Sequence, residues 1–123
     1  MDDIFLISKQ PLTMSQIAEE ATSLGYEVFL NAKGDAASIR SRPPRAALTS
    51  WQHQRLLLDD PSNVSLKRLG GVDLFCVSHH RIQLAHFRDL FDFFVFRREC
   101  LVGSDDDDFS PIYSIENIHD LFS

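Results

Sequence analysis

Cysteine, glycine and tryptophan are scarce in this chain of 123 residues, which has two cysteines, five glycines and one tryptophan. Two cysteines are too few for the disulfide framework on which many small secreted domains depend. Each of them, Cys76 and Cys100, lies inside an apolar stretch. We therefore expect two buried, inert free thiols, as is typical of a protein kept in a reducing cytosol.

Long hydrophobic runs are also missing. No stretch reaches the roughly 20 apolar residues that a membrane-spanning helix needs. The opening residues, MDDIFLISKQ, are acidic and lack the basic start and long apolar region of a secretory signal. We expect a cytoplasmic protein that does not act at a membrane.

Signatures of catalysis are absent as well. The sequence has no glycine-rich phosphate loop, no nucleophile elbow and no paired zinc-binding cysteines. A helical zinc site needs two histidines four residues apart with a glutamate between them, and His79, His80 and His86 do not match that spacing. We expect no catalytic residue, no metal and no other cofactor. A small metal-dependent enzyme that uses His79, His80 and Asp89 stays open as an alternative.

The composition, 44% hydrophobic and 24% charged, predicts one folded domain over residues 1–123. Its clearest element is a helix after Thr13, whose spacing to Gln16 is that of a capping box and which Gly25 would end. A near-continuous apolar run over residues 72–78 predicts a buried central strand.

Weaker patterns predict the remaining elements. Strands are expected over residues 3–8, 26–32, 36–41 and 94–102, helices over 47–58, 79–94 and 114–122, and turns at 33–35, 59–63 and 70–71. The strand–helix–strand opening and the mixture that follows predict an α+β fold, with a single mixed sheet covered by two or three helices.

No lysine or arginine occurs after residue 99. Residues 1–99 hold twelve acidic and twelve basic side chains, so the formal net charge of −6 comes entirely from residues 100–123. This balance argues against nucleic acid and anionic lipid as partners. The acidic side chains of this segment are Asp105, Asp106, Asp107, Asp108, Glu116 and Asp120.

Three roles fit the four adjacent aspartates. They can form a solvated loop that keeps the protein soluble, or they can face the chain's own basic segment RSRPPR at residues 40–45. They can also form a docking surface, because neighbouring carboxylates repel one another and a cationic partner relieves that repulsion. Phe109 and Tyr113 follow them, and an aromatic anchor beside a charged rim is typical of a tight interface. A calcium loop fits poorly, since the acids do not alternate and the required glycine is missing.

The acidic stretch GSDDDDFSPIY at residues 103–113 lies in one short acidic α+β domain without a catalytic motif. In these features the chain resembles the small immunity proteins that bacteria make alongside their own contact-dependent or secreted toxins. The resemblance implies a cytoplasmic antitoxin that binds a cognate toxin with a basic surface, a nuclease for example, and covers its active site with acidic groups. We expect the partner to be contacted by Asp105, Asp106, Asp107, Asp108, Phe109, Tyr113, Glu116 and Asp120.

A regulatory binding module is the remaining alternative. Residues 35–71 carry a local excess of positive charge, six basic against three acidic side chains. A nucleic acid could be contacted there through Arg40, Arg42, Arg45, Lys67 and Arg68.

Overall fold

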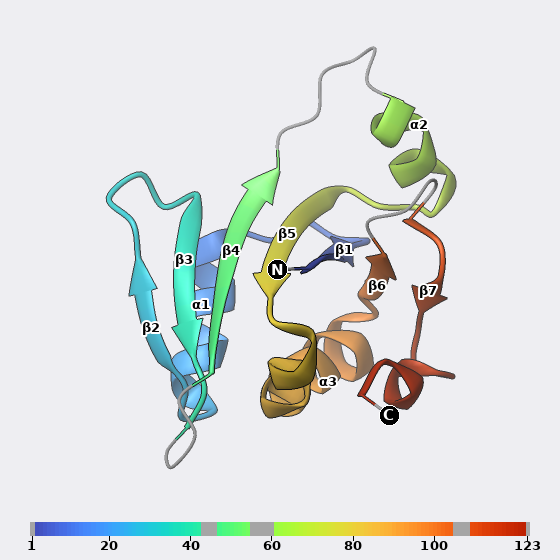
Figure 1. Ribbon diagram of the computed structural model, residues 1–123. Coiled ribbons are helices and arrows are strands. Elements are labelled where there is room, and N and C mark those ends of the chain that lie inside the picture. Colours follow the sequence, from blue (N-terminus) through green and yellow to red (C-terminus); the bar gives the residue numbers. More distant parts are fainter. Residues whose placement is uncertain (1, 43–46, 55–60, 105–108, 123) are drawn as a thin grey trace.

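A computed structural model of the protein describes residues 2–42, 47–54, 61–104 and 109–122. Its centre is one seven-stranded sheet in the order β2-β3-β4-β5-β1-β6-β7 (Figure 1). The strands are β1 (Asp2–Ser8), β2 (Glu27–Leu30), β3 (Ala36–Arg40), β4 (Leu48–Gln54), β5 (Asp73–His79), β6 (Leu101–Ser104) and β7 (Ile112–Tyr113).

The helices are α1 (Met14–Ser23), α2 (Pro61–Arg68) and α3 (Arg88–Arg98). A 3-10 helix over Arg81–Phe87 leads into α3, and another over Ile118–Phe122 follows β7. None of the helices in the described part of the chain is long and apolar enough to cross a membrane. The α+β class and the single sheet are confirmed. Neighbouring strands are antiparallel in every described pairing, so the sheet is not the mixed one expected.

The helix α1 begins and ends where local chemistry predicts. The Gln16 backbone N–H donates to the Thr13 hydroxyl at 3.2 Å, and the Thr13 N–H donates to the Gln16 side chain at 2.9 Å. These two bonds satisfy backbone donors that the first helical turn leaves free. Gly25 follows with a φ of +95°, a conformation that side chains with a Cβ rarely adopt.

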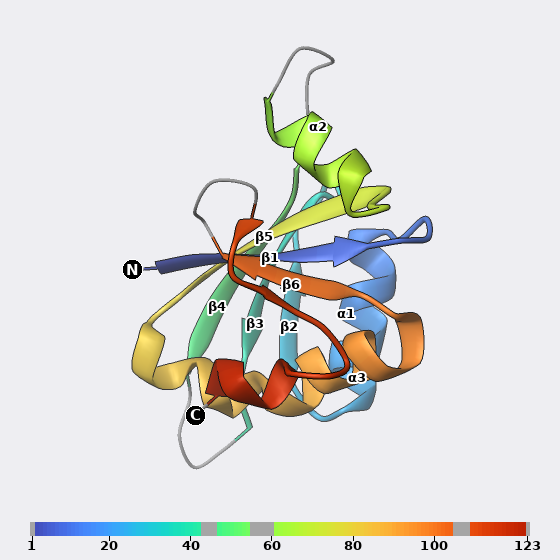
Figure 2. The same cartoon turned by 90° about the vertical axis from the view of Figure 1, so that its right-hand side faces the viewer.

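The main hydrophobic core lies between one face of the sheet and the two longer helices, α1 and α3. In it Trp51 of β4 stacks on Phe91 of α3, with ring centroids 5.5 Å apart, and Tyr26 stacks on Phe87 at 5.7 Å. A smaller cluster, made by Ile7, Leu66, Leu74 and Phe109, covers part of the opposite face beneath α2. The rest of that second face, over β3, β4 and part of β5, has no helix on it (Figure 2).

The helix expected over residues 47–58 is wrong for the part that the structure describes. Residues 48–54 form strand β4, in which Thr49 and Trp51 are buried while Leu48, Ser50 and Gln52 are exposed. This alternation has the period of two that a half-buried strand requires. The final part of the predicted helix, residues 55–58, lies outside the described residues.

Two further boundaries differ from the prediction. Pro61 starts the helix α2, where a turn was expected over residues 59–63, because proline suits a first helical position. The strand expected over 94–102 is wrong in its first half, because α3 continues through the buried Phe94 and Val95 to Arg98. Only Leu101–Ser104 is strand.

The last predicted helix is shorter than expected. Residues 112–113 are strand β7, and a turn separates them from the 3-10 helix over Ile118–Phe122. Ile118 is the buried side chain of that final segment.

The packing of Phe91 predicts a large effect of its removal. Phe91 is fully buried, so Phe91→Ala should lower the free energy of unfolding by about 3–5 kcal/mol. Phe96 lies on the same helix but is 50% exposed. Phe96→Ala should therefore change the free energy of unfolding by less than about 0.5 kcal/mol. Urea unfolding followed by circular dichroism measures both, and equal losses would contradict this core.

Candidate functional site

The start of β1 and the end of β6 lie side by side, so Asp2 and Asp3 lie close to the residue that precedes the four aspartates in the sequence. Ile4 is paired with Ser104, and Figure 2 shows the two strand ends together near the N-terminus. Asp2 and Asp3 immediately precede Ile4, and the four aspartates immediately follow Ser104. We call Asp2, Asp3 and the segment that leaves Ser104 the acidic edge. Asp105, Asp106, Asp107 and Asp108 themselves lie outside the described residues.

Phe109 has a different role from the one expected. Only 6% of it is exposed, and its ring meets Phe5 edge to face at a centroid distance of 5.4 Å. A Cβ added at Gly103 would lie 2.7 Å from the Phe109 Cβ, so this close approach needs glycine. Phe109 is therefore not an exposed anchor for a partner. It is a core side chain that fixes the point at which the chain returns after the four aspartates.

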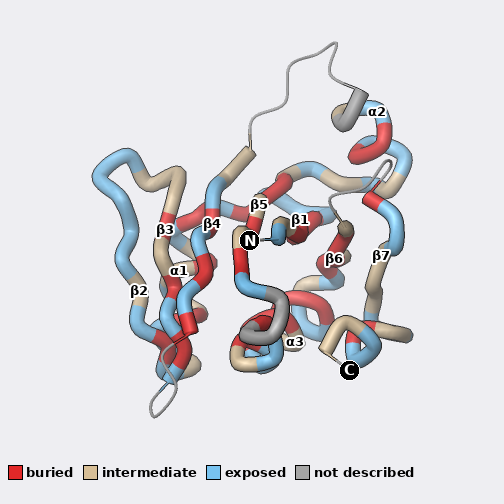
Figure 3. Tube along the Cα trace, viewed as in Figure 1, coloured by how far each residue is buried: buried red, intermediate tan, exposed pale blue. Residues whose placement is uncertain are grey.

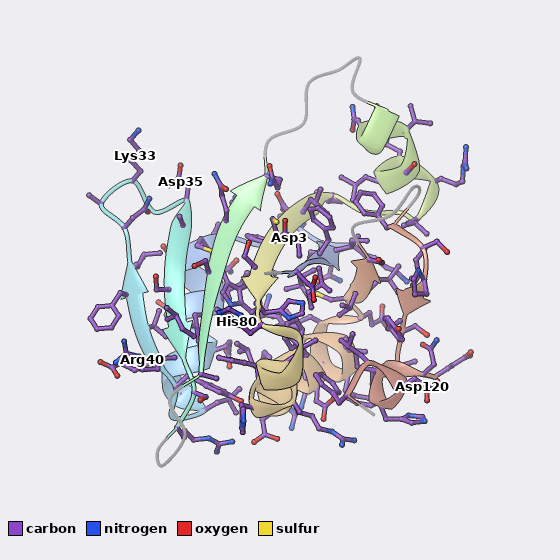
Figure 4. The ribbon with its side chains drawn as sticks, viewed as in Figure 1. Asp3, Lys33, Asp35, Arg40, His80 and Asp120 are labelled. Atoms are coloured by element: carbon purple, nitrogen blue, oxygen red, sulfur yellow. The ribbon has the colours of Figure 1, made fainter. Side chains whose placement is uncertain are left out.

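The other expected contact residues lie farther along the C-terminal segment. Tyr113 is half-buried against the main core, whereas Glu116 and Asp120 are exposed. The Asp120 carboxylate lies 3.4 Å from the His119 ring. Figure 4 shows Asp3 and Asp120 well apart, so the described acids do not form one continuous patch.

The basic segment engages α3 through Arg42. Its guanidinium donates to the Asp89 carboxylate at 2.6 Å and lies over the Tyr26 ring at 5.2 Å. The hydrogen bond to Asp89 raises the pKa of Arg42 above its usual value. Arg42 follows β3, whereas Lys67 and Arg68 end α2 at the far side of the sheet (Figure 1). These basic residues do not share one surface, and Arg45 lies outside the described residues.

The histidines do not converge on a site. His79 is 3% exposed, and neither of its ring nitrogens has a hydrogen-bond partner within the described structure. The adjacent His80 is exposed, and Asp89 is held by Arg42. Among the described residues no three histidine, cysteine or acidic side chains lie close enough together to hold a metal ion. The structure therefore shows no assembled metal site, within the described residues, for the alternative enzyme that would use His79, His80 and Asp89.

The uncovered sheet face carries a row of small polar side chains that the sequence reasoning missed. Ser38, Ser50 and Ser78 are direct neighbours on β3, β4 and β5, and Asp3 is the next residue of that row on β1. The Ser78 hydroxyl donates to the Asp3 carboxylate at 2.6 Å. We call this the serine row. Its far end is Phe29, which pairs with Ser38.

A groove of about 390 Å³ follows the serine row. Besides the three serines it is lined by Asn31, Gln52 and Cys76, which offer hydroxyl, amide and thiol groups. The lining of the groove includes Ser78, whose hydroxyl donates to Asp3, so the groove adjoins the acidic edge there. The missed signal was the alternation in LTSWQHQ, which places Ser50 and Gln52 on the face opposite Trp51.

The chain was compared with protein families, curated proteins and solved structures. No family model, curated protein or solved structure matches the chain.

The two thiols differ in environment and should differ in reactivity. Cys76 is partly exposed in the groove, whereas Cys100 is 1% exposed. Burial raises the pKa of the Cys100 thiol to about 11, so that it stays protonated near neutral pH, and thiols react as thiolates.

An aromatic disulfide reagent at mildly alkaline pH should therefore react quickly with one thiol per native molecule, that of Cys76. The second thiol, that of Cys100, should react only after the protein is unfolded. Cys76→Ser should remove the fast phase and Cys100→Ser should keep it. Rapid labelling of both thiols would contradict the burial of Cys100.

Proposed function

We propose that this chain is a cytoplasmic bacterial immunity protein that binds a cognate toxin with a basic surface, such as a nuclease domain, and blocks its active site. The observation that supports this best is the pairing of Ile4 with Ser104. That pairing places Asp2 and Asp3 beside the origin of the four-aspartate segment. The partner surface would comprise the acidic edge and the groove that adjoins it.

The acidic edge supplies the long-range part of recognition. Adjacent carboxylates repel one another, so the free protein holds charge that a cationic surface can neutralise. Such surplus charge speeds the encounter with an oppositely charged partner and adds specificity.

The groove supplies the short-range part of recognition. Ser38, Ser50, Ser78 and Gln52 present neutral hydroxyl and amide groups, which can donate or accept hydrogen bonds. Small side chains leave room for a partner's side chains to approach the sheet. Directional hydrogen bonds of this kind mainly slow dissociation, since most affinity differences between related complexes arise in the dissociation rate.

A nuclease cleft attracts the phosphates of its substrate through basic side chains. A row of carboxylates presents similar negative charge without a bond that the enzyme can cleave. The proposed inhibition is therefore occlusion: the acidic edge occupies the basic cleft, and the groove holds the surface beside it. No chemical step by this chain is required.

The first test removes the charge of the four aspartates. If a neighbouring gene encodes a toxin domain, that domain is the partner to use. Changing Asp105, Asp106, Asp107 and Asp108 to asparagine should lower the rate of association with it by about 10-fold or more at low salt. It should also flatten the dependence of that rate on salt, because steering is screened by ions. Stopped-flow or surface-based kinetics across a salt series measures both.

A smaller variant allows a control of equal charge. Asp106→Asn with Asp107→Asn is compared with Glu19→Gln with Glu20→Gln, because the latter pair lies on α1, which packs on the other face of the sheet. Only the aspartate pair should slow association. An unchanged rate and salt slope would refute the electrostatic part, and a wild-type protein that does not bind the neighbouring toxin would refute the immunity function.

The second test fills the groove. Ser50 is exposed in the middle of the serine row, so Ser50→Arg places a long cationic side chain where a basic partner would dock. We expect affinity to fall by at least about 10-fold, mainly through faster dissociation. Ser23→Arg at the exposed C-terminal turn of α1 makes the same chemical change and should bind as wild type. Equal binding by both variants would show that the groove is not part of the interface.

A further inference from the structure

Strand β2 is one edge of the sheet, and half of its backbone groups point away from the protein. The Asn31 N–H donates to the Ala36 carbonyl at 2.9 Å, so Asn31 faces β3. Because the direction alternates along a strand, Phe29 and Glu27 also face β3 with their backbone groups. The N–H and C=O groups of Val28 and Leu30 therefore point outward, where another strand could pair with them.

This edge is also unusually apolar for an unpaired one. Phe29 is 59% exposed and Leu30 is 41% exposed, on opposite faces of the sheet. Figure 3 shows most of β2 as exposed. Natural edge strands are commonly protected by charges, proline or a bulge. Within β2 the only charged residue is Glu27, at its first position.

We propose that a second copy of this chain pairs with β2 as an antiparallel strand, with a two-fold axis passing beside Phe29. A two-fold axis perpendicular to the sheet keeps each side chain on its own face. Phe29 then lies opposite Phe29 of the other copy, and Val28 lies opposite Leu30. The two sheets join into one continuous sheet.

The backbone directions agree with this register. Val28 and Leu30 have outward N–H and C=O groups, so they form the hydrogen-bonded pairs across the two-fold axis. The Phe29 pair becomes the closely spaced type without hydrogen bonds, in which side chains meet most directly. Both exposed apolar side chains are covered at once.

The exposed Phe29 ring selects the same register. With the axis at Phe29, Glu27 lies opposite the neutral Asn31. With the axis at Val28, Phe29 would lie opposite Glu27, and with the axis at Leu30 it would lie opposite Asn31. In neither register does Phe29 gain an aromatic contact. The strand is thus complementary to itself in one register, and this self-complementarity is the reason for assigning a second copy as the occupant.

The area involved predicts a weak, reversible dimer. A fully buried phenylalanine removes about 150–250 Å² from water, and Phe29 has somewhat more than half of its surface left to bury. A few such residues from each copy fall well short of the roughly 1,200–2,000 Å² of a stable complex. The acidic edge lies on β1 and β6, away from β2 in the strand order, so dimerisation leaves it accessible.

Sedimentation velocity of the purified chain, from roughly 10 μM to 1 mM, tests the proposal. The weight-average mass of the wild type should rise with concentration from the monomer toward the dimer. Leu30→Pro removes one outward N–H but no donor to β3, so it should keep the fold and weaken association at least about 10-fold. Phe29→Lys should do the same, because it places two like charges together at the axis.

The control is Phe96→Lys, which makes the same change at a 50% exposed phenylalanine on α3. It should associate as wild type, and circular dichroism confirms that all variants are folded. A wild type that stays monomeric throughout the range would overturn the proposal. So would Leu30→Pro or Phe29→Lys variants that remain folded and dimerise like the wild type, or an equal loss of association in Phe96→Lys.

Discussion

The pairing of β1 with β5 is the constraint on which the other features depend. Seven residue pairs join the two strands without interruption, from Asp2 with His79 to Ser8 with Asp73. The ladder sets which side chains of β1 face the main core and which face the open side. It also leaves the second edge of β1 for β6. At its far end Asp73 accepts a hydrogen bond from the Leu12 N–H at 2.9 Å and lies at the same distance from the His53 ring, which ties the entry to α1 to the sheet.

Elements specified by neighbouring residues could be predicted from the sequence. The cap at Thr13 and the glycine at position 25 define α1 through contacts within a few residues, and the apolar run before His79 marks β5 as central. β4 was misassigned because its alternation is short and is followed by three leucines, which continue a helical pattern equally well. The extent of α3 was misjudged because Phe94 and Val95 are compatible with either period until their neighbours in the core are known.

Much less of the candidate site than of the fold could be predicted from local sequence patterns. Counting charges located the acidic segment, but the proximity of Asp2 and Asp3 to it arises from a pairing between residues 100 positions apart, Ile4 and Ser104. The burial of Phe109 could not be predicted either, since its space is created by the absent side chain of Gly103. The serine row requires the registers of four strands at once, and no short stretch of sequence contains them.

The position of β1 in the middle of the sheet has a consequence for how the protein forms. β1 precedes the other described strands in the sequence, and it is followed by β5 only after some 70 further residues and by β6 only after nearly 100. Pairings between residues far apart in the sequence form more slowly than local ones. The entropy cost of closing a long loop comes before any stabilising contact is made. β1 therefore cannot be paired on both sides until β5 and β6 have both been synthesised, and until then its apolar side chains lack the neighbours that cover them in the native sheet.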